Sequence, residues 1–253
     1  MPYAETEAGR LFYTETPGPS ETPALVLIHG AGGSRLHWPS ELRRMKGATV
    51  YTLDLPGHGR SDDMGCETIL AHARVVATFL ECVVARSATI VGHSMGGAIA
   101  QTLAIRGETH ASALVLIGTG ARLRVAPAIL HAIGEDFESA VDLVTDYAWS
   151  PGAAPALKEL GREALRETGP DVLLRDFRAC DGFDVIGRLE EIRVPALVIV
   201  GCEDRLTPVK YSRFLTERLR DARMVTIDRA GHMVMLEQPV RMAEAVRGFL
   251  AAD

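Results

Sequence analysis

Strand-like and helix-like patterns of apolar residues alternate along most of this chain of 253 residues. Tyr3 to Thr16 alternates apolar and polar residues like a β-hairpin, and a turn rich in Pro, Gly and Ser then leads into an unbroken apolar run. The patterns that follow are strand Ala24 to His29, strand Thr49 to Leu53, helix Thr68 to Val84, strand Ala88 to Val91, helix Met95 to Arg106 and strand Ala113 to Ile117. Continuous apolar strands separated by helices are typical of a parallel sheet with helices on both faces.

The strand pattern is interrupted between about Gly118 and Gly187. Helical periodicity broken by Gly and Pro replaces it, at Ala126 to Ile133, Phe137 to Trp149, Ala156 to Thr168 and Val172 to Ala179. The earlier alternation then returns, as strand Pro195 to Gly201, helix Val209 to Leu219, strand Arg223 to Ile227 and helix Val240 to Leu250. We therefore predict one α/β domain with a mostly parallel twisted sheet. Its core is residues 1–118 and 188–253, and residues 119–187 are an inserted helical cap.

Composition and charge are in the range of ordinary globular proteins. The formal net charge is −6 and the basic residues are scattered, so nucleic acid is not an expected partner. No apolar run approaches the roughly 20 residues that span a bilayer, and the N-terminus lacks a secretory pattern, so we expect a cytoplasmic protein without membrane contact. The 4 cysteines lack the spacing of a metal site, and no motif indicates a cofactor. No pattern in the chain fixes the oligomeric state.

The run Gly92-His93-Ser94-Met95-Gly96 has the form GxSxG. By itself the match is weak, because chance alone would produce one in a chain of this length with a probability on the order of one in ten. Its context strengthens it, since the run follows a buried strand and opens a helix, which is the turn that exposes a nucleophilic serine. We predict that Ser94 is a nucleophile. The alternative is a serine that only caps the helix.

A serine hydroxyl is a poor nucleophile without a general base, and His232 is the candidate. It is the one histidine of 8 that lies in a loop after the last predicted strand. His29, His58 and His93 lie in tight turns near strand ends, where an imidazole more often bonds the backbone. The remaining histidines are interpreted as surface or packing residues, namely His37, His72, His110 and His131.

The imidazole in turn needs a carboxylate that fixes its tautomer, and Asp204 is the candidate. It lies just past the strand that ends at Gly201 and precedes His232 by about one strand-helix-strand unit. The resulting order of serine, acid and histidine is the one found in GxSxG hydrolases. Glu203 is a local alternative to Asp204, and Asp54 is a weaker one.

Attack on a carbonyl places negative charge on oxygen, which two backbone donors must stabilise. The amide of Met95 is one candidate, because it lies at a helix N-terminus where the helix dipole also favours negative charge. The second donor is expected from the glycine-rich turn that follows His29. Ala31 is the first choice there and Gly32 the second, while a flexible turn without a donor role is the alternative.

The chain resembles the alpha/beta-hydrolase superfamily over nearly its whole length, and most closely its small bacterial esterase, lactonase and cofactor-free haloperoxidase-like branch. The resemblance rests on LVLIHGAGGS (Leu25 to Ser34), DLPGHGRSD (Asp54 to Asp62), GHSMGG (Gly92 to Gly97), PALVIVGCEDRLTP (Pro195 to Pro208) and AGHMVMLEQP (Ala230 to Pro239). It implies that Ala31 and Met95 supply the oxyanion-hole amides and that Asp204 is the acid. Several esterase relatives carry a large aromatic residue where this chain has Ala31, which affects the shape of the acyl pocket rather than the backbone donor.

The helical insertion is expected to cover the carboxyl edge of the sheet and to form the roof of a pocket. Candidate pocket walls are Trp38, Phe137, Tyr147, Trp149, Met233 and Val234. The predicted activity is hydrolysis of a small carboxylic ester or lactone through an acyl-enzyme on Ser94. Hydrolysis of a carbon–carbon bond in a vinylogous diketone, of the meta-cleavage-product type, is an alternative with the same residues. A non-catalytic small-molecule receptor or signalling protein on the same fold is another, because fold does not fix function.

Overall fold

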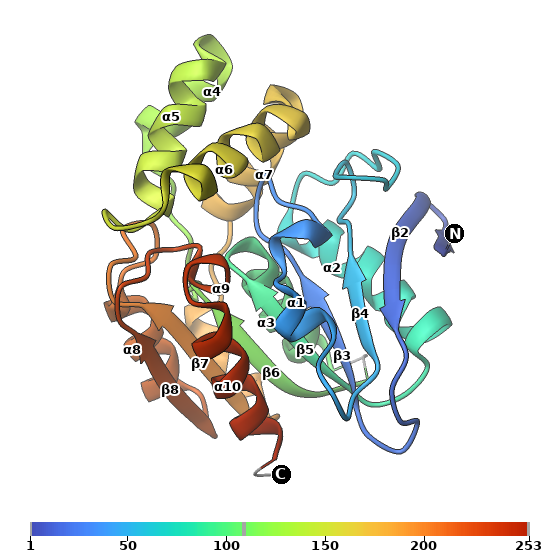
Figure 1. The fold of residues 1–253 in the computed structure, drawn as a ribbon. Helices are drawn as coiled ribbons and strands as arrows, with labels where there is room; N and C mark the ends of the chain where they lie inside the picture. Colours follow the sequence, from blue (N-terminus) through green and yellow to red (C-terminus); the bar gives the residue numbers. More distant parts are fainter. Residues whose placement is uncertain (1, 108–109, 252–253) are drawn as a thin grey trace.

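The computed structural model describes residues 2–107 and 110–251, so residues 1, 108–109 and 252–253 of the predicted core lie outside it. Within this range a single sheet has the strand order β1-β2-β4-β3-β5-β6-β7-β8 (Figure 1). The strands are β1 (Tyr3–Thr6), β2 (Gly9–Thr16), β3 (Ala24–Ile28), β4 (Val50–Leu53), β5 (Ala88–His93), β6 (Ala111–Ile117), β7 (Ala196–Gly201) and β8 (Ala222–Ile227). The pairs β1–β2 and β2–β4 are antiparallel and all others are parallel. The predicted hairpin and the mostly parallel sheet are confirmed.

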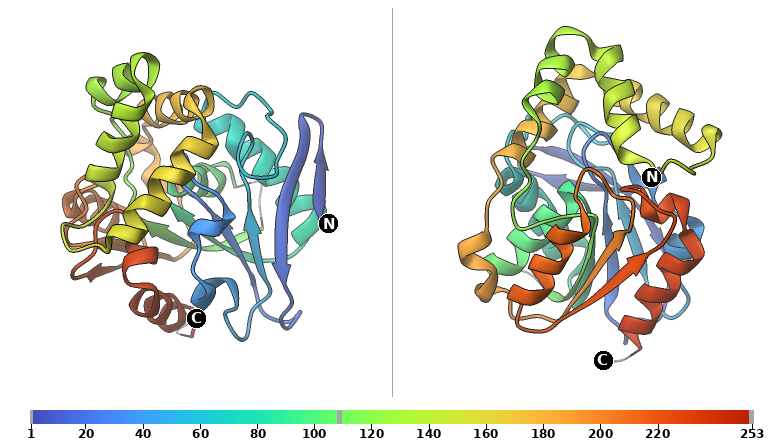
Figure 2. Two further views of the ribbon diagram at one scale, coloured as in Figure 1. Left: turned by 45° about the horizontal axis from the view of Figure 1, so that its top comes forward. Right: turned by 90° about the vertical axis from the view of Figure 1, so that its left-hand side faces the viewer.

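Helices cover both faces of the sheet, as the continuous apolar strands predict (Figure 2). The core helices are α1 (Ser40–Arg43), α2 (Ile69–Phe79), α3 (Met95–Arg106), α8 (Val209–Arg218), α9 (Val234–Glu237) and α10 (Pro239–Leu250). Val26 and Ile28 of β3 pack in the cluster that includes α2, α3 and α8, whereas Leu25 and Leu27 pack in the one that includes α1 and α10. Strands β3, β5, β6 and β7 contribute alternate side chains to these two cores in this way. Within the described residues no helix is long and apolar enough to cross a membrane.

The structure differs from the predicted elements mainly in short segments. The single helix expected over Thr68 to Val84 is α2 followed by a π-helix, η2 (Leu80–Val84), which ends at Ala85 with a φ of +49°. A π-helix changes the winding but still buries Leu80 and Val84, so the apolar pattern contains no sign of it. The short helices missed by periodicity are η1 (Arg35–His37), α1, η3 (Ile186–Glu191) and α9. Helices of three to six residues are too short for a 3.6-residue period to be detected.

The segment between β6 and β7 that we call the helical insertion, residues 119–187, contains four α-helices. They are α4 (Pro127–Glu135), α5 (Phe137–Ala148), α6 (Pro155–Thr168) and α7 (Pro170–Asp181). A proline opens α4, α6 and α7, where its fixed φ suits the first helical turn. The insertion lies beyond the carboxyl ends of the parallel strands, at the end of the molecule opposite the last turn of α10 (Figures 1 and 2). The four predicted helices are present, and the limits 119–187 remain a prediction.

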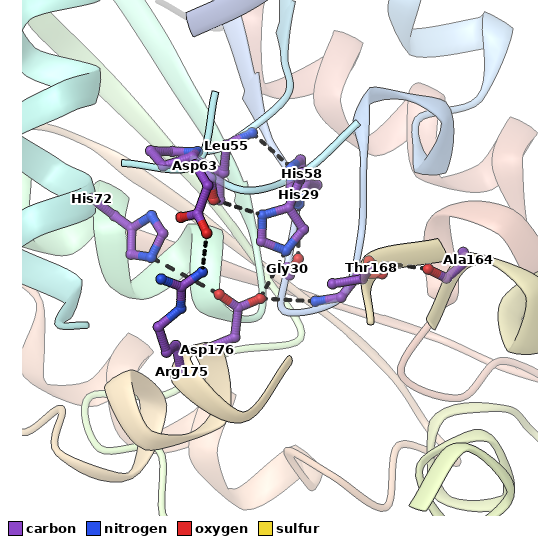
Figure 3. A network of polar contacts seen from close by, with 12 residues as sticks. His29, Gly30, Leu55, His58, Asp63, His72, Ala164, Thr168, Arg175 and Asp176 are labelled. Carbon is purple, nitrogen blue, oxygen red and sulfur yellow. Dashed lines mark hydrogen bonds and ion pairs between the residues drawn. The ribbon is translucent and has the colours of Figure 1, made fainter. Parts of the chain in front are cut away.

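A buried ion pair connects the insertion to the core (Figure 3). Oδ2 of Asp176, on α7, lies 2.9 Å from Nε2 of His58, and Nδ1 of His58 lies 3.0 Å from the carbonyl oxygen of Pro56. Burial alone would lower the pKa of His58, but the charge and hydrogen bond of Asp176, together with the Pro56 carbonyl, raise it above its ordinary value. On the same helix, Nη2 of Arg175 lies 2.6 Å from Oδ2 of Asp63, and this ion pair is more exposed.

Replacing His58 should therefore destabilise the protein more at acidic than at alkaline pH. A raised folded-state pKa means that the pair stabilises fully below the unfolded-state pKa of histidine, and that this stabilisation is lost as the pH rises through the folded-state value. His58→Gln should lower the free energy of unfolding by about 3 kcal/mol near pH 5.5, because a buried partner charge is left unpaired, and by less near pH 9. Urea denaturation at both pH values measures the difference.

The exposed His131, on α4, provides the control. His131→Gln should change the free energy of unfolding by less than about 0.5 kcal/mol at either pH. A loss for His58→Gln that is the same at both pH values would show that no charged pair forms.

Candidate active site

Ser94 occupies the turn between β5 and α3, in a backbone conformation that residues other than glycine rarely adopt. Its φ is +52° and its ψ is −114°. Its amide donates to the carbonyl oxygen of Ile117 at 2.8 Å, and its own carbonyl accepts from the hydroxyl of Thr119 at 2.9 Å. These bonds to the neighbouring strand hold the residue in place, since such a conformation persists only where the surroundings determine it. The side chain of Ser94 faces a cavity.

Two glycines make this turn sterically possible. A Cβ atom on Gly92 would lie 2.2 Å from the carbonyl oxygen of Gly96, and one on Gly96 would lie 2.2 Å from that of Ile28. Strand β5, helix α3 and strand β3 therefore approach each other more closely than any side chain would permit. The two glycines of the GxSxG pattern are required by this contact.

His232 and Asp204 are hydrogen-bonded to each other in the loops after β8 and β7. Nδ1 of His232 lies 2.9 Å from Oδ2 of Asp204, and both residues are buried. A carboxylate accepts, so this bond places a proton on Nδ1 and leaves Nε2 as the other ring nitrogen. His232 lines the same cavity as Ser94, although no hydrogen bond joins these two side chains among the described residues. Catalytic contacts of this kind often shorten only in the substrate complex.

Thr207 is part of this arrangement and was missed by the sequence interpretation. Its hydroxyl donates to Oδ2 of Asp204 at 2.8 Å and lies 3.2 Å from Nδ1 of His232. The other carboxylate oxygen of Asp204 accepts the amides of Leu206 and Thr207, at 2.9 and 2.8 Å. An Asp followed three residues later by Thr was the available signal, because such a pair closes a local turn.

The competing carboxylates do not contact His232. Asp54 is fully buried, and its oxygens accept from the backbone amide and guanidinium of Arg35, at 2.8 and 2.7 Å, and from the amide of Arg60. Glu203 lines a separate pocket together with Arg229. Among the described residues, Asp204 is thus the carboxylate that bonds His232.

The histidines interpreted as structural each bond a backbone carbonyl. His29 bonds Gly30, His58 bonds Pro56, and Nε2 of His93 lies 3.0 Å from the carbonyl oxygen of His232. Burial, reinforced by the neighbouring His232, holds the pKa of His93 far below its ordinary value, so this ring stays neutral.

His37 departs from the sequence interpretation, because it lines the cavity rather than lying at the surface or only packing. Burial, with a smaller contribution from the nearby His58, lowers the pKa of His37 to about 4, so it too is neutral near pH 7. Its place on the short helix η1 gave no periodic signal.

The glycine-rich turn approaches Ser94 closely. A Cβ atom on Gly30 would lie 3.0 Å from the Cβ atom of Ser94, and Ala31 and Gly32 also line the cavity. Among the described residues the amides of Ala31 and Met95 have no hydrogen-bond acceptor, whereas the amide of Gly32 donates to Oδ2 of Asp176 at 3.0 Å. Of the three candidate donors, Ala31 and Met95 are therefore the two whose amides have no acceptor among the described residues.

The cavity has a volume of about 350 Å³ and lies between the turns that carry Ser94 and His232 and the helical insertion. Its wall is mostly apolar, with insertion residues Val125, Ile129, Leu143, Val144, Leu165 and Phe177. Arg124 and Arg205 contribute to the lining. Arg205 also stacks on the ring of Tyr147, 5.3 Å from its centroid. A small, largely apolar molecule with one reactive polar group fits such a site.

Three of the six predicted wall residues line this cavity, namely Tyr147, Trp149 and Met233. The prediction is wrong for the other three. Trp38 and Val234 are fully buried in the core cluster beneath the site, and Phe137 packs within the helical insertion. Trp38 and Val234 lie near the turns of the site in sequence, but an apolar side chain next to a loop gains more from turning into the core.

No group of three or more His, Cys, Asp or Glu side chains is placed to hold a metal ion within residues 2–107 and 110–251. The four cysteines are free thiols, with Cys66 and Cys180 buried and Cys82 and Cys202 exposed. Burial raises the pKa of Cys66 to about 11 and raises that of Cys180 further, so these thiols are poor nucleophiles.

The chemistry that this site can perform is therefore nucleophilic attack by a serine. Such attack needs a hydroxyl, a base and donors for an oxyanion, and the residues placed at these positions are Ser94, His232 and the amides of Ala31 and Met95.

Comparison with known proteins places the chain among hydrolases. The sequence model of the alpha/beta hydrolase family matches residues 25–245. A pimeloyl-(acyl-carrier protein) methyl ester esterase of Neisseria meningitidis serogroup B is 28% identical over 248 residues, which cover 92% of this chain and 94% of that protein. A thermophilic esterase of known structure is 36% identical, with a TM-score of 0.89 over 99% of this chain and 96% of its own. An N-acyl homoserine lactone degrading enzyme is 25% identical, with a TM-score of 0.87 over 98% of this chain and 100% of its own.

Removing the hydroxyl of Thr207 should reduce the reactivity of Ser94. Thr207→Val keeps the shape but removes the bond to Asp204, so we expect covalent labelling of Ser94 by a fluorophosphonate to slow about fivefold, the effect of one hydrogen bond of about 1 kcal/mol. Thr216→Val is the control, because the hydroxyl of Thr216 bonds only the Ser212 carbonyl within α8. Equal rates for Thr207→Val and the wild type would contradict the role assigned to Thr207.

Proposed function

The chain belongs to the alpha/beta hydrolase family, and from this premise we propose that it is a serine hydrolase of small carboxylic esters or lactones. The reaction proceeds through an acyl-enzyme on Ser94. The observation that carries the proposal is the placement of Ser94 and His232 on one apolar cavity, with His232 held by Asp204 at 2.9 Å. Each of these groups has a defined role in acyl transfer.

In the acylation step, Oγ of Ser94 attacks the carbonyl carbon of the ester while Nε2 of His232 takes the hydroxyl proton. The carbon–oxygen double bond opens and its oxygen becomes an oxyanion. His232 becomes an imidazolium, which the buried carboxylate of Asp204 stabilises. The imidazolium then gives its proton to the leaving alkoxide, and the carbon–oxygen bond of the ester breaks.

The amides of Ala31 and Met95 stabilise the oxyanion. Met95 is the first residue of α3, so its amide has no acceptor within the helix and lies at the positive end of the helix dipole. Gly32 is the less suitable second donor, because its amide already donates to Asp176 at 3.0 Å. This existing hydrogen bond favours Ala31 over Gly32 as the second donor to the oxyanion.

Deacylation repeats the same steps with water as the nucleophile. Nε2 of His232 takes a proton from water, the hydroxide adds to the acyl carbon, and the oxyanion forms again between the two amides. When it collapses, Ser94 leaves with the proton from His232 and the carboxylic acid is released. No cofactor takes part in any of these steps.

The cavity indicates the kind of substrate. Its volume of about 350 Å³ and its apolar wall suit a short or medium acyl chain or a small lactone ring. The helical insertion, residues 119–187, acts as the cap that supplies most of this wall and excludes water. The relatives described as an esterase, a methyl ester esterase and a lactone degrading enzyme support this substrate class.

Burst kinetics with p-nitrophenyl esters, from acetate to decanoate, tests the proposal. The wild type should release p-nitrophenol with turnover that peaks at an intermediate acyl length, because the cavity is of limited size. Ser94→Ala should lose turnover by more than about a thousandfold, since the other groups cannot act without the nucleophile. Ser40→Ala, at an exposed position, is the control and should match the wild type.

Turnover that persists in Ser94→Ala would contradict the proposal. So would a wild type that hydrolyses neither these esters nor a set of lactones. Vinylogous diketones tested beside them distinguish ester hydrolysis from cleavage of a carbon–carbon bond.

A further inference from the structure

A carboxylate of the helical insertion reaches the turn that lies beside the nucleophile. Asp176, on α7, is only 1% exposed, and its Oδ2 accepts both the amide of Gly32 at 3.0 Å and Nε2 of His58 at 2.9 Å (Figure 3). Its other oxygen lies 3.9 Å from Nε2 of His72. A buried carboxylate lowers the stability of the fold unless its oxygens are hydrogen-bonded or paired with a charge. One of the bonds that stabilise Asp176 comes from a backbone amide of the turn beside Ser94.

The insertion contacts residue 32 on more than one side. The hydroxyl of Thr168, at the end of α6, lies 3.3 Å from the carbonyl oxygen of Gly32. A Cβ atom on Gly32 would lie 2.6 Å from a methyl group of Leu165 and 2.7 Å from one of Leu173. The peptide groups of Gly32 are thus enclosed by α6 and α7, and the absence of a side chain at this position permits the enclosure.

Gly32 is the third residue of a tight turn. The amide of Gly33 donates to the carbonyl oxygen of Gly30 at 3.1 Å, and the φ of Gly32 is +62°, as a type II turn requires at its third position. In such a turn the bond to Asp176 fixes the orientation of the peptide that joins Ala31 to Gly32. The first residue, Gly30, packs on Ser94, so the turn is held by the insertion on one side and meets the nucleophile on the other.

We propose that Asp176 is a positioning residue for the hydrolytic reaction: by holding the amide of Gly32 from the helical insertion, it fixes the turn that presents the amide of Ala31 to the oxyanion. The oxyanion hole is then complete only while α7 is docked on the core. This inference rests on the proposed function, because it concerns the donor that the acyl-transfer reaction uses.

The surrounding charges fit this role. An unpaired carboxylate one residue from the oxyanion hole would oppose the negative charge of the transition state. His58 removes this conflict, because its bonds to Asp176 and to the Pro56 carbonyl leave both ring nitrogens protonated and the pair neutral overall. Arg175 bonds Asp63 and interacts with Asp176 only through its charge, and burial lowers the pKa of His72 to about 4, so His58 is the cation in direct contact with Asp176.

The test measures covalent labelling of Ser94 by a fluorophosphonate, which requires the oxyanion hole but no knowledge of the natural substrate. The limiting rate of labelling and the half-saturating probe concentration are determined separately, well below the melting temperature of each variant. Asp176→Ala removes the acceptor of the Gly32 amide. Asp176→Asn keeps an acceptor oxygen, and Arg175→Ala removes the adjacent ion pair with Asp63 without affecting Gly32.

Asp176→Ala should lower the limiting rate at least about tenfold, a part of the roughly hundredfold loss that follows removal of an oxyanion donor. The half-saturating probe concentration should change less than about twofold, because the cavity wall is intact. Asp176→Asn should recover most of the rate, and Arg175→Ala should match the wild type within about twofold. A purely structural role would lower the melting temperature of Asp176→Ala and leave its limiting rate unchanged, which would overturn the proposal.

A second variant applies if Asp176→Ala does not fold. The double replacement His58→Leu with Asp176→Leu leaves no unpaired buried charge and still removes the acceptor of Gly32, so it should fold and label as slowly as Asp176→Ala. Labelling of this variant at the wild-type rate overturns the inference alone. A wild type that the probe does not label at Ser94 overturns the proposed function, and the inference with it.

Discussion

The close approach of β3, β5 and α3 around Ser94 is the constraint on which the rest of the site depends. With Cβ atoms at 92 or 96 the backbones would collide, and without that approach Ser94 could not be held at a φ of +52°. Bonds to Ile117 and Thr119, in and just after β6, maintain the conformation. The strained backbone of Ser94 costs folding free energy, and its hydrogen bonds to the sheet offset this cost.

The parallel sheet brings the remaining groups to this point. Strands β3, β5, β7 and β8 all end at the same edge, so the turn after β3, the serine after β5, Asp204 after β7 and His232 after β8 meet there although they are far apart in sequence. The hydrogen bond from His93 to the carbonyl of His232 links the serine turn to the histidine loop directly. Helices α4 to α7 then close the edge and supply an apolar wall.

Local patterns were sufficient to predict much of this arrangement. Ser94, Asp204 and His232 each lie shortly after the end of a strand. Apolar runs locate strand ends well, so these three positions could be predicted. The sequence favoured Ala31 over Gly32, but the contact that occupies the Gly32 amide could not be predicted locally, because its acceptor, Asp176, lies 144 residues away. The buried positions of Trp38 and Val234 were missed for a related reason, since a loop residue can face either the cavity or the core.

Transfer of an acyl group to Oγ of Ser94 is tested most directly by mass spectrometry of the quenched protein. The protein is mixed with a p-nitrophenyl ester, quenched with acid within milliseconds to seconds, and digested for peptide mapping. The account predicts a mass increase equal to one acyl group, confined to the peptide that contains Ser94 and absent from Ser94→Ala. Hydrolysis that proceeds with no adduct at any quench time, or with the adduct on another residue, would contradict it.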